Sequence, residues 1–450
     1  YIAAATKAAV TLVEKHRMGG DCLNTGCVPS KALLRSAKIR HLAAHGDHYG
    51  LQPAVLDLEF RDVMARVRNV IGVECISGAA TIVSPYRVRV GDRELTTRSI
   101  IIAAGARPLV PPIPGLDGID YLTSDTLWNL ERLSPRLLVL GGGPIGCEIA
   151  QAFARLGSTV TLVEMAPRLL VREDPIVSAE IERALTDDGI TLALNRRAAA
   201  FHGNGPGGTV VCEDASDASA EPLEVAFDRV VVALGRRPNT EGYGLEALGV
   251  SLSESNTVAT DPFLATNFPN IYACGDVAGP FQFTHTAAHQ AWYATINSLF
   301  GAFKRFKVDY SVIPWCTFTD PEVARVGLSQ AEADAGGVDY ELTSYGIDDL
   351  DRAIADGVAR GFVRVLTKRG SDRILGVTIV GEHAGDLIAE FVLAMKHGLG
   401  LNKILGTIHI YPTLAEANKF AAGNWRRAHA PAWLLKIAAR YHRYRRGDSR

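Results

Sequence analysis

One five-residue sequence occurs twice in this chain, and the residues around it constrain the fold. Val-Thr-Leu-Val-Glu occupies residues 10–14 and again residues 160–164. Before the second copy, the apolar run 137–140 leads into a glycine-rich segment, 141–146, and then into an alanine-rich, helix-forming stretch. A strand, a Gly-x-Gly-x-x-Gly turn, a helix and a second strand that ends in an acid form a nucleotide-binding β-α-β unit. The second copy therefore predicts a parallel α/β fold.

The second copy also carries the residues with which such a unit binds a dinucleotide. Three glycines permit the tight turn and the close approach of a pyrophosphate to the helix N-terminus. They are Gly141, Gly143 and Gly146. Glu164 lies 18 residues after the last of them, where a carboxylate can accept hydrogen bonds from a ribose 2′-hydroxyl. This carboxylate would repel a 2′-phosphate, so we expect NAD(H), with NADP(H) as the alternative because Arg168 and Arg172 lie nearby.

The first copy predicts another dinucleotide-binding unit, cut short. The offset of 150 residues between the copies places its three glycines before residue 1. We therefore expect residues 1–5 to end the first helix of this unit, residues 10–13 to form its second strand, and Glu14 to contact a ribose. Roughly 20 residues of the complete unit, including its N-terminal strand and Gly-rich turn, would then be absent from the chain.

Two cysteines, Cys22 and Cys27, stand five residues apart at the start of an apparent helix. An undistorted helix would hold them too far apart for a disulfide, whose Cα atoms must lie within roughly 7 Å. Gly26 and Pro29 allow the chain to tighten before the helix begins. A Cys27 thiolate would then lie at the positive end of this helix and near Lys31, which favours thiol exchange. The spacing alone leaves open a structural disulfide or two inert thiols.

The composition is that of a multi-domain α/β protein with a large core. The 450 residues are 47% hydrophobic and include 43 glycines, which fits roughly three domains. No apolar run approaches the roughly 18–20 residues of a transmembrane helix, and the first residues do not resemble a signal peptide. Seven cysteines, mostly scattered, do not suit a secreted disulfide framework. We expect a cytoplasmic protein, and a formal charge of -2 gives no reason to expect nucleic acid binding.

Two dinucleotide units beside a dithiol suggest an electron path, and the chain resembles the pyridine nucleotide-disulfide oxidoreductases from residue 1 to about residue 425. The Gly-Gly-x-Cys-x-Asn-x-Gly-Cys-x-Pro-Ser-Lys motif of residues 19–31 carries this resemblance. Four further segments match in order: 100–108, 233–239, 270–276 and 318–328. The resemblance implies an α/β fold with two dinucleotide-binding (Rossmann-like) domains and a C-terminal α+β dimerisation domain, a homodimer, and FAD and NAD as cofactors.

The resemblance also implies a reaction. Electrons would pass from the nicotinamide through FAD to the redox disulfide of Cys22 and Cys27, and on to a disulfide, dithiol or soft-metal substrate. Two alternatives stay open. One is a flavin-dependent NADH:quinone or oxygen reductase in which the dithiol is a bystander. The other is a dihydrolipoamide dehydrogenase-type component of a larger assembly.

Individual roles follow from the same resemblance. Cys22 would be the interchange thiol that meets the substrate, and Cys27 would face the flavin. Lys31, on the same helix face as Cys27, would point at the flavin and pair with Glu148, which could instead be an ordinary exposed glutamate. The implied cofactor-binding residues are Glu14, Gly20, Lys31, Gly78, Ala79, Ala104, Gly105, Gly141, Gly143, Gly146, Glu164, Gly235, Arg236, Gly275 and Asp276.

The segment 407–416 distinguishes between related activities. In dihydrolipoamide dehydrogenases and glutathione reductases, the residue before the proline of this segment is a histidine, contributed across the dimer, which acts as acid-base catalyst. Here that position is Tyr411, while the glutamate that orients the histidine is kept as Glu416. Tyrosine, with a pKa of about 10, is a poor base at pH 7, so efficient dihydrolipoamide oxidation is not expected. His409, two residues earlier, could substitute for the histidine or could be structural.

A tyrosine in this region also resembles the mercuric reductase branch, as do residues 172–175 and 312–327. Those reductases carry a vicinal cysteine pair near the C-terminus that transfers Hg(II) to the active site, because soft thiolates select soft metals. This chain has no cysteine after Cys316, and we expect no metal site. The sequence therefore leaves the substrate undetermined.

The resemblance divides the chain into four segments. Residues 1–128 and 257–308 are the two parts of the FAD-binding domain, 129–256 the NAD(P)-binding domain, and 309–450 the dimerisation domain. The dimer would share its active site between subunits through Tyr411 and Glu416. Residues 425–450 combine aromatic, aliphatic and basic side chains, which resembles an interfacial amphipathic helix for a membrane or a protein partner. A helix packed on its own dimer is the alternative.

Overall fold

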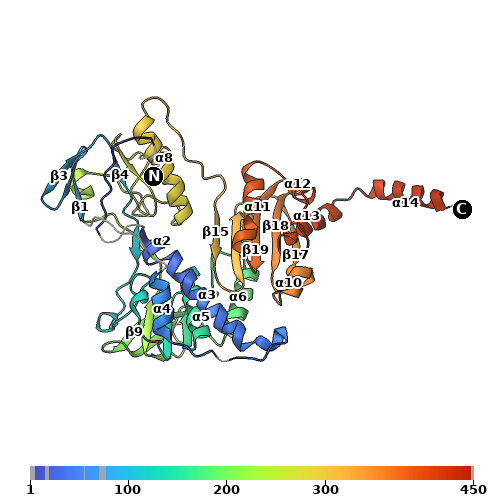
Figure 1. The fold of residues 1–450 in the computed structure, drawn as a ribbon, viewed down its shortest axis with the longest axis horizontal. Helices are drawn as coiled ribbons and strands as arrows, with labels where there is room; N and C mark the ends of the chain where they lie inside the picture. The colour runs from blue at the N-terminus through green and yellow to red at the C-terminus, as the bar shows by residue number, and fades with distance from the viewer. Residues whose placement is uncertain (1–5, 16–19, 55, 70–77, 447–450) are drawn as a thin grey trace. The chain divides into compact units, whose positions relative to one another are not determined.

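The computed structural model describes residues 6–15, 20–54, 56–69 and 78–446, and Figure 1 shows its ribbon. Contacts between residues divide the chain into two compact units. Unit 1 contains residues 1–171 and 182–310, and unit 2 contains residues 172–181 and 311–450. Helix α6 (Pro175–Asp187) therefore begins in unit 2 and ends in unit 1.

Four parallel strands form the main sheet of unit 1, in the order β12-β6-β7-β8. Their bounds are β6 Arg136–Leu140, β7 Thr159–Val163, β8 Thr191–Ala193 and β12 Arg229–Val232. Helix α5 (Pro144–Leu156) connects β6 to β7 and completes the predicted β-α-β unit. Leu138, Val139 and Leu162 are fully buried, as expected for a parallel sheet that is covered on both faces. A three-stranded antiparallel sheet accompanies it, built from β9 (Arg196–Gly203), β10 (Gly208–Asp214) and β11 (Leu223–Phe227).

The rest of unit 1 contains short sheets and helices. Two strand pairs join distant parts of the chain: β4 (Ile100–Ile102) with β14 (Ile271–Ala273), and β5 (Ala106–Pro108) with β13 (Arg236–Pro238). An antiparallel meander consists of β1 (Ala80–Ser84), β2 (Arg87–Val90) and β3 (Arg93–Thr96). The helices are α2 (Gly20–Asn24), α3 (Cys27–Ala44), α4 (Phe60–Asn69), α7 (Leu245–Leu248) and α8 (Thr284–Phe300).

The strand predicted for residues 10–13 is not formed, so this prediction is wrong. No described strand pairs with these residues, and Val10 and Leu12 are exposed. A strand exists only where its N–H and C=O groups pair with a neighbouring strand. The adjacent Glu14 carbonyl does accept a hydrogen bond from the Gly78 N–H, at 2.8 Å. The helix end predicted at residues 1–5 lies outside the described residues.

Helix α3 packs along helix α5 within unit 1. Apolar residues of α3 at helical spacing, Pro29, Leu33 and Ala37, are buried. Near the other end of the pair, Arg40 Nη1 donates to the Arg155 carbonyl at 2.7 Å. This carbonyl belongs to the last turn of α5, where the helix dipole favours a cation. The helix that begins at Cys27 is thus fixed to the helix that follows the glycine-rich turn.

Unit 2 is an α+β domain around one antiparallel sheet, in the order β15-β16-β19-β18-β17 (Figure 1). The strands are β15 (Pro314–Thr317), β16 (Glu322–Gly327), β17 (Tyr340–Gly346), β18 (Phe362–Lys368) and β19 (Ile374–Gly381). The helices are α9 (Gln330–Ala335), α10 (Asp351–Ala355), α11 (Ala384–Lys396), α12 (Leu401–Leu405), α13 (Glu416–Ala428) and α14 (Ala432–Arg446). Ile379, Phe391 and Trp425 belong to one apolar core. Trp425, which the sequence groups with the basic tail, is therefore a core residue.

Unit 2 contains a buried charge, Arg325 of β16, which is 1% exposed. Its Nε atom lies 3.0 Å from Glu173 Oε2, and its Nη1 atom donates to Glu332 Oε2 at 2.6 Å. The guanidinium lies over the Trp315 ring, 4.3 Å from the ring centroid. Burial raises the pKa of Glu173, although Arg325 acts in the opposite direction. Because a buried charge is costly unless it is paired, these contacts hold residues 172–181 on the sheet of unit 2.

We predict that Arg325→Met lowers the free energy of unfolding of unit 2 by about 3–5 kcal/mol, because Glu173 then lies buried without its cation. The matched control, Arg369→Met, removes an exposed ion pair with Asp339 and should cost less than about 1 kcal/mol. Urea denaturation followed by tryptophan fluorescence measures both changes. Equal losses in the two variants would contradict the importance given to the buried pair.

Candidate active site

The two motif cysteines form a disulfide in unit 1. Cys22 lies in α2, Cys27 begins α3, and their Cα atoms are 4.5 Å apart. The chain turns between the two helices at Gly26, where an added Cβ would lie 3.1 Å from the Asp21 carbonyl oxygen. The predicted disulfide is confirmed, and the glycine permits the close turn that it needs.

Lys31 follows the disulfide by one helical turn and pairs with Glu148. Lys31 Nζ lies 2.9 Å from Glu148 Oε2, which joins α3 to α5 by an ion pair. Glu148 is only 6% exposed, so it is not the ordinary exposed helix glutamate that the sequence left open. A buried carboxylate requires a cation, and the pair therefore fixes the position of the ammonium group. The roles of both residues toward a flavin stay predictions.

Arg236 connects the disulfide segment to the second glycine-acid motif. Its guanidinium forms an ion pair with Asp21 of α2, and its Nε atom lies 3.6 Å from Asp276 Oδ2. Burial raises the pKa of Asp276, while Arg236 opposes this shift. Gly275, with a φ of 78°, donates its N–H to Gln290 Oε1 at 2.6 Å. The structure thus places three predicted cofactor-binding residues together: Arg236, Gly275 and Asp276.

Other predicted cofactor contacts are backbone positions at turns. Asn239 donates from its backbone N–H to the Gly105 carbonyl at 3.0 Å, and from Nδ2 to the Ala104 carbonyl at 2.9 Å. Gly105 and Gly235 have φ angles of 66° and 118°, which glycine adopts most readily. The pairing of β5 with β13 holds these two turns.

Glu14, Gly78 and Ala79 form another group of predicted contacts. The hydrogen bond from the Gly78 N–H to the Glu14 carbonyl brings the two segments together. Gly20 is the first residue of α2, with a φ of 64°. Their assignment to FAD stays a prediction.

The turn between β6 and α5 has the shape that a dinucleotide requires. Gly141 has a φ of 106°, and an added Cβ would lie 2.5 Å from the Ala233 carbonyl oxygen. A Cβ at Gly146 would collide with the Gly141 carbonyl oxygen, so only glycine lets α5 approach β6 this closely. Gly143 is the N-cap residue of α5 and brings no side chain to the helix N-terminus, which leaves the backbone N–H groups there accessible to a pyrophosphate. These residues fit the phosphates of a dinucleotide.

Glu164 stands at the end of β7, where the ribose of such a nucleotide would lie. Its Oε2 accepts from the Gly142 N–H at 2.5 Å, and its Oε1 accepts from the Ala166 N–H at 2.7 Å. Arg168 donates to the Val171 carbonyl at 2.9 Å. The carboxylate is thus held in place by backbone groups.

His409 lies in unit 2, and both of its ring nitrogens are engaged. Nδ1 lies 3.0 Å from the Thr407 carbonyl oxygen, and Nε2 lies 3.0 Å from Glu390 Oε1. Asn418 Nδ2 donates to Glu390 Oε2 at 2.9 Å. The His409 side chain is only 6% exposed. These contacts favour the structural histidine over the substitute base.

Tyr411 is 67% exposed, and its hydroxyl has an acidic partner. The O–H donates to Asp351 Oδ2 at 3.0 Å, and this hydrogen bond raises the pKa of the phenol. Glu416 is buried at the start of α13 and accepts from the Thr413 N–H at 3.3 Å. Asp351, rather than Glu416, is therefore the carboxylate bonded to the Tyr411 hydroxyl.

Three residues at these sites were missed by sequence reasoning. The Thr284 hydroxyl lies 3.5 Å from Cys27 Sγ and also contacts Cys22 Sγ. Asp351 binds the tyrosine hydroxyl, and Glu390 binds the buried histidine. They come from the first turns of α8 and α10 and from α11, outside every motif. Tertiary packing brings these three residues to the sites, and no sequence motif indicates their positions.

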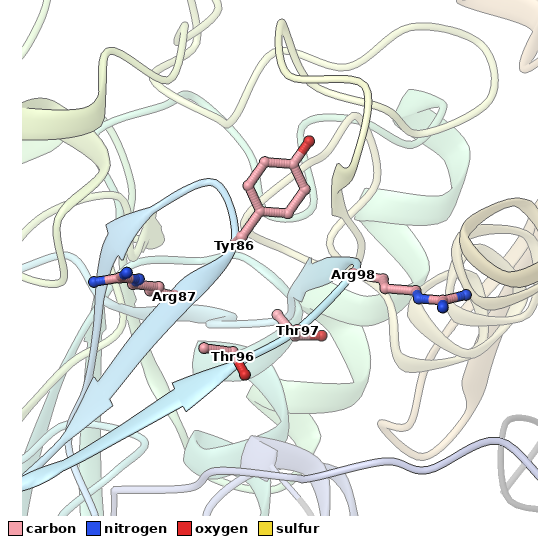
Figure 2. Close-up of a pocket in the computed structure, with 5 residues that line it drawn as sticks. All are labelled: Tyr86, Arg87, Thr96, Thr97 and Arg98. Atoms are coloured by element: carbon pink, nitrogen blue, oxygen red, sulfur yellow. The ribbon is translucent and has the colours of Figure 1, made fainter.

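A shallow pocket opens beside β2 and β3 (Figure 2). Its volume is about 350 Å³, and its lining residues are Tyr86, Arg87, Thr96, Thr97 and Arg98. Figure 2 shows Arg87 and Arg98 pointing to opposite sides, and Arg87 Nη1 lies 3.0 Å from Glu94 Oε1. The two arginines therefore do not converge on a ligand. In the part of the chain that the structure describes, no cluster of histidine, cysteine and acidic side chains could hold a metal ion.

Two features of the structure identify its class. One is the fold of each unit, and the other is a disulfide on a helix that packs against the helix of the glycine-rich turn. The chain belongs to the pyridine nucleotide-disulphide oxidoreductase family, whose model matches residues 1–291. The model of the family's dimerisation domain matches residues 313–422. The predicted fold class is confirmed.

Relatives with different names resemble most of the chain. The mercuric reductase of Lysinibacillus sphaericus is 36% identical over 431 residues, which are 92% of this chain and 78% of that protein. The dihydrolipoyl dehydrogenase of Chlamydia muridarum is 34% identical over 442 residues, which are 92% of each chain. Among solved structures, LpdA from Mycobacterium tuberculosis has a TM-score of 0.82 at 27% identity, covering 95% of this chain and 96% of that one. The HOCl-induced flavoprotein disulfide reductase RclA from Escherichia coli has a TM-score of 0.81 at 26% identity, covering 94% and 95%.

Family membership establishes the reaction class. The protein is an FAD-dependent oxidoreductase that passes electrons from a nicotinamide nucleotide through FAD to the Cys22–Cys27 disulfide and on to a substrate. Its dimerisation domain makes it a homodimer. A quinone or oxygen reductase with a bystander dithiol is not favoured.

We predict that Cys22 and Cys27 become reactive when NADH reduces the enzyme, while the buried cysteines Cys147, Cys212 and Cys274 stay unreactive. Burial raises the pKa of Cys212 and Cys274 to about 11, and it also raises the pKa of Cys147. These thiols are therefore protonated and unreactive at neutral pH. Iodoacetamide labelling followed by peptide mass spectrometry measures each site.

Two serine variants provide the matched comparison. Cys22→Ser should abolish disulfide reduction, because the Cys22–Cys27 disulfide can no longer form. Cys316→Ser changes a cysteine outside the disulfide and should leave turnover unchanged. Turnover that survives in Cys22→Ser would refute a path through the dithiol.

Proposed function

We propose that the protein is an NADH-consuming reductase of disulfides whose thiols are acidic, rather than an oxidant of dihydrolipoamide. One observation carries this proposal: Tyr411 replaces the expected catalytic histidine, and its hydroxyl proton is held by Asp351. A phenol with a raised pKa stays protonated at neutral pH and cannot take a proton from an incoming dithiol. His409 offers no replacement, because both of its ring nitrogens are engaged.

In the reductive direction, the group at this position would act as an acid toward the departing sulfur rather than as a base toward an incoming thiol. Bound FAD would supply the transfer of two electrons from NADH, with which the Cys22–Cys27 disulfide opens to a dithiol. The Cys22 thiolate attacks one sulfur of the substrate disulfide and expels the other as a thiolate. The Cys27 thiolate then attacks the mixed disulfide at Cys22, which releases the second product and restores the Cys22–Cys27 bond. In sum, NADH, one proton and a disulfide give NAD⁺ and two thiols.

The same contact explains a preference for acidic thiols. The Tyr411 proton points at Asp351, so it does not assist the departing sulfur. Without an acid, the rate depends on how readily the leaving thiol departs as a thiolate, and thiols of low pKa depart faster. Aromatic disulfides therefore suit this site better than alkyl disulfides.

We further propose that the active site is completed across the homodimer. The family's dimerisation domain and the resemblance of residues 407–416 support this arrangement. The partner subunit's Tyr411 would then face Cys22, and the buried Glu416 would support the loop that carries the tyrosine, through the Thr413 N–H.

The proposed electron donor is NADH rather than NADPH. Glu164 is held by two backbone N–H groups at the position where a ribose hydroxyl would bind, and a 2′-phosphate would meet its negative charge. A disulfide that cycles with NADH requires a reducing compartment, which supports the cytoplasm.

Hg(II) is the second candidate acceptor. Five relatives at 33–36% identity are named mercuric reductases. A thiolate-bound soft metal ion also needs no base at Tyr411. Hg(II) therefore belongs in the same substrate screen.

The proposal predicts a steep dependence of turnover on the leaving thiol. With NADH as donor, an aromatic disulfide such as 5,5′-dithiobis(2-nitrobenzoate) should be reduced faster than oxidised glutathione or lipoamide. Tyr411→His introduces a group that titrates near neutral pH, so dihydrolipoamide oxidation should rise by about 10²–10⁴-fold. Tyr411→Phe, which also removes the phenol, should not produce this gain. Fast dihydrolipoamide oxidation by the unmodified enzyme would overturn the proposal.

The tyrosine itself can be titrated. Asp351→Asn removes the carboxylate that raises the pKa of Tyr411, so this pKa should fall toward the ordinary value of about 10. The phenolate then forms at lower pH than in the unmodified protein. Ultraviolet difference spectra, with Tyr411→Phe to identify the signal, measure the shift. Asp349→Asn, an exposed neighbour on the same segment, should leave the titration unchanged.

Glu164→Ala should raise the ratio of kcat/KM for NADPH to that for NADH by about tenfold, because the repulsion of a 2′-phosphate is removed. Glu224→Ala, which removes an exposed carboxylate on β11, is the control and should leave the ratio unchanged. Steady-state kinetics with a fixed acceptor give both ratios. A preference for NADPH in the unmodified enzyme would show that the donor is wrongly assigned.

A further inference from the structure

Helix α14 is not used by the reductase chemistry, and none of its residues is buried. The match to the dimerisation domain ends at residue 422, before this helix begins. Figure 1 shows α14 extending beyond α13, away from the sheet of unit 2. The helix therefore contributes nothing to the described core and presents its side chains outward.

The segment before α14 is firmly attached to unit 2. Trp425, in α13, is 5% exposed, and its ring stacks on His429 with 4.2 Å between centroids. His429 Nε2 lies 2.7 Å from Glu341 Oε2 on β17. Pro431 follows, and α14 begins at the next residue. An exposed helix thus starts from a fixed point on a folded domain.

One stripe of α14 is apolar and aromatic. Trp433, Ile437, Tyr441 and Tyr444 are separated by four, four and three residues, so they lie along one helix face. Each is more than half exposed. A contiguous apolar stripe that the chain does not cover is typical of an interaction surface.

The helix is also strongly basic. Lys436, Arg440 and Arg443 repeat along a second stripe, and Arg445 and Arg446 follow. These five cations, with no aspartate or glutamate in residues 432–446, give the helix a formal charge of +5. The whole chain carries -2, so this positive charge is concentrated here.

We propose that α14 binds the surface of an anionic lipid bilayer, with the apolar stripe among the acyl chains and the basic side chains at the lipid phosphates. Tryptophan and tyrosine prefer the boundary between hydrocarbon and water. Lysine and arginine extend their charged ends from the apolar boundary to the head groups. A basic amphipathic helix is typical of interfacial membrane binding, and anionic lipid supplies the uniform negative charge that matches five cations without an acid.

The helix lies on the bilayer rather than through it. Its 15 residues extend over roughly 22 Å, less than the thickness of the hydrocarbon layer. Of the helices that the structure describes, none combines the length and apolar character needed to cross a membrane. The reductase would therefore work while docked at a membrane surface.

Sedimentation of the full-length holoenzyme with lipid vesicles tests this proposal. Vesicles of phosphatidylcholine with phosphatidylglycerol should retain the enzyme, vesicles of phosphatidylcholine alone should not, and salt should weaken retention because it screens the charges. Retention that does not depend on the anionic lipid, or no retention at all, would overturn the proposal.

Two matched variants locate the binding surface. Lys436→Glu/Arg440→Glu/Arg443→Glu should lower vesicle partitioning by roughly tenfold or more. Arg89→Glu/Lys368→Glu/Lys403→Glu makes the same change in net charge at exposed positions elsewhere and should leave it unchanged. Equal losses would indicate a general charge effect. A dimer that dissociates only in the α14 variant, without any vesicle effect, would identify a second copy of the chain as the occupant.

Fluorescence tests the apolar stripe separately. Trp433 is 65% exposed, so its emission should shift to shorter wavelength on anionic vesicles. Trp433→Phe should remove this shift while the enzyme still sediments. Ile437→Ser/Tyr441→Ser should reduce sedimentation and leave NADH-dependent turnover in the absence of lipid unchanged. A Trp433 signal that does not respond to anionic vesicles would contradict insertion.

Discussion

The packing of α3 on α5, closed by the Lys31–Glu148 ion pair, is the constraint on which the active site depends. Helix α3 begins at the disulfide and α5 begins at the glycine-rich turn, so one helix pair fixes the redox group relative to the nucleotide cradle. The buried carboxylate of Glu148 makes the pairing specific, because removing the lysine would leave a charge without compensation. Arg40 holds the far end against the last turn of α5.

Reaction type and choice of substrate reside in different parts of the chain. The disulfide that receives the electrons lies in unit 1, as do the glycine cradle and the Asp21–Arg236–Asp276 group. The residues proposed to select the direction of transfer lie in unit 2, where Asp351 holds the Tyr411 proton.

Features set by local backbone requirements could be predicted from the sequence, and features set by tertiary packing could not. The β-α-β unit and the disulfide depend on glycines at fixed spacing, such as Gly146 and Gly26, whose need for close backbone contact is visible in the sequence. The strand expected at residues 10–13 failed because a strand also needs a partner. The roles of Asp351 and Glu390 could not be predicted, because the residues that they bind, Tyr411 and His409, are distant in sequence.

The boundary between the two units passes through a helix. The first half of α6 packs with unit 2 and the second half with unit 1, although the remaining residues of unit 2 begin only at residue 311. Protease cleavage or truncation near residue 311 would therefore not liberate an intact dimerisation domain. The fragment would lack Glu173, and Arg325 would keep its place in the sheet without its buried anion. Unit 2 thus includes a segment, residues 172–181, that lies between two stretches of unit 1 in the sequence.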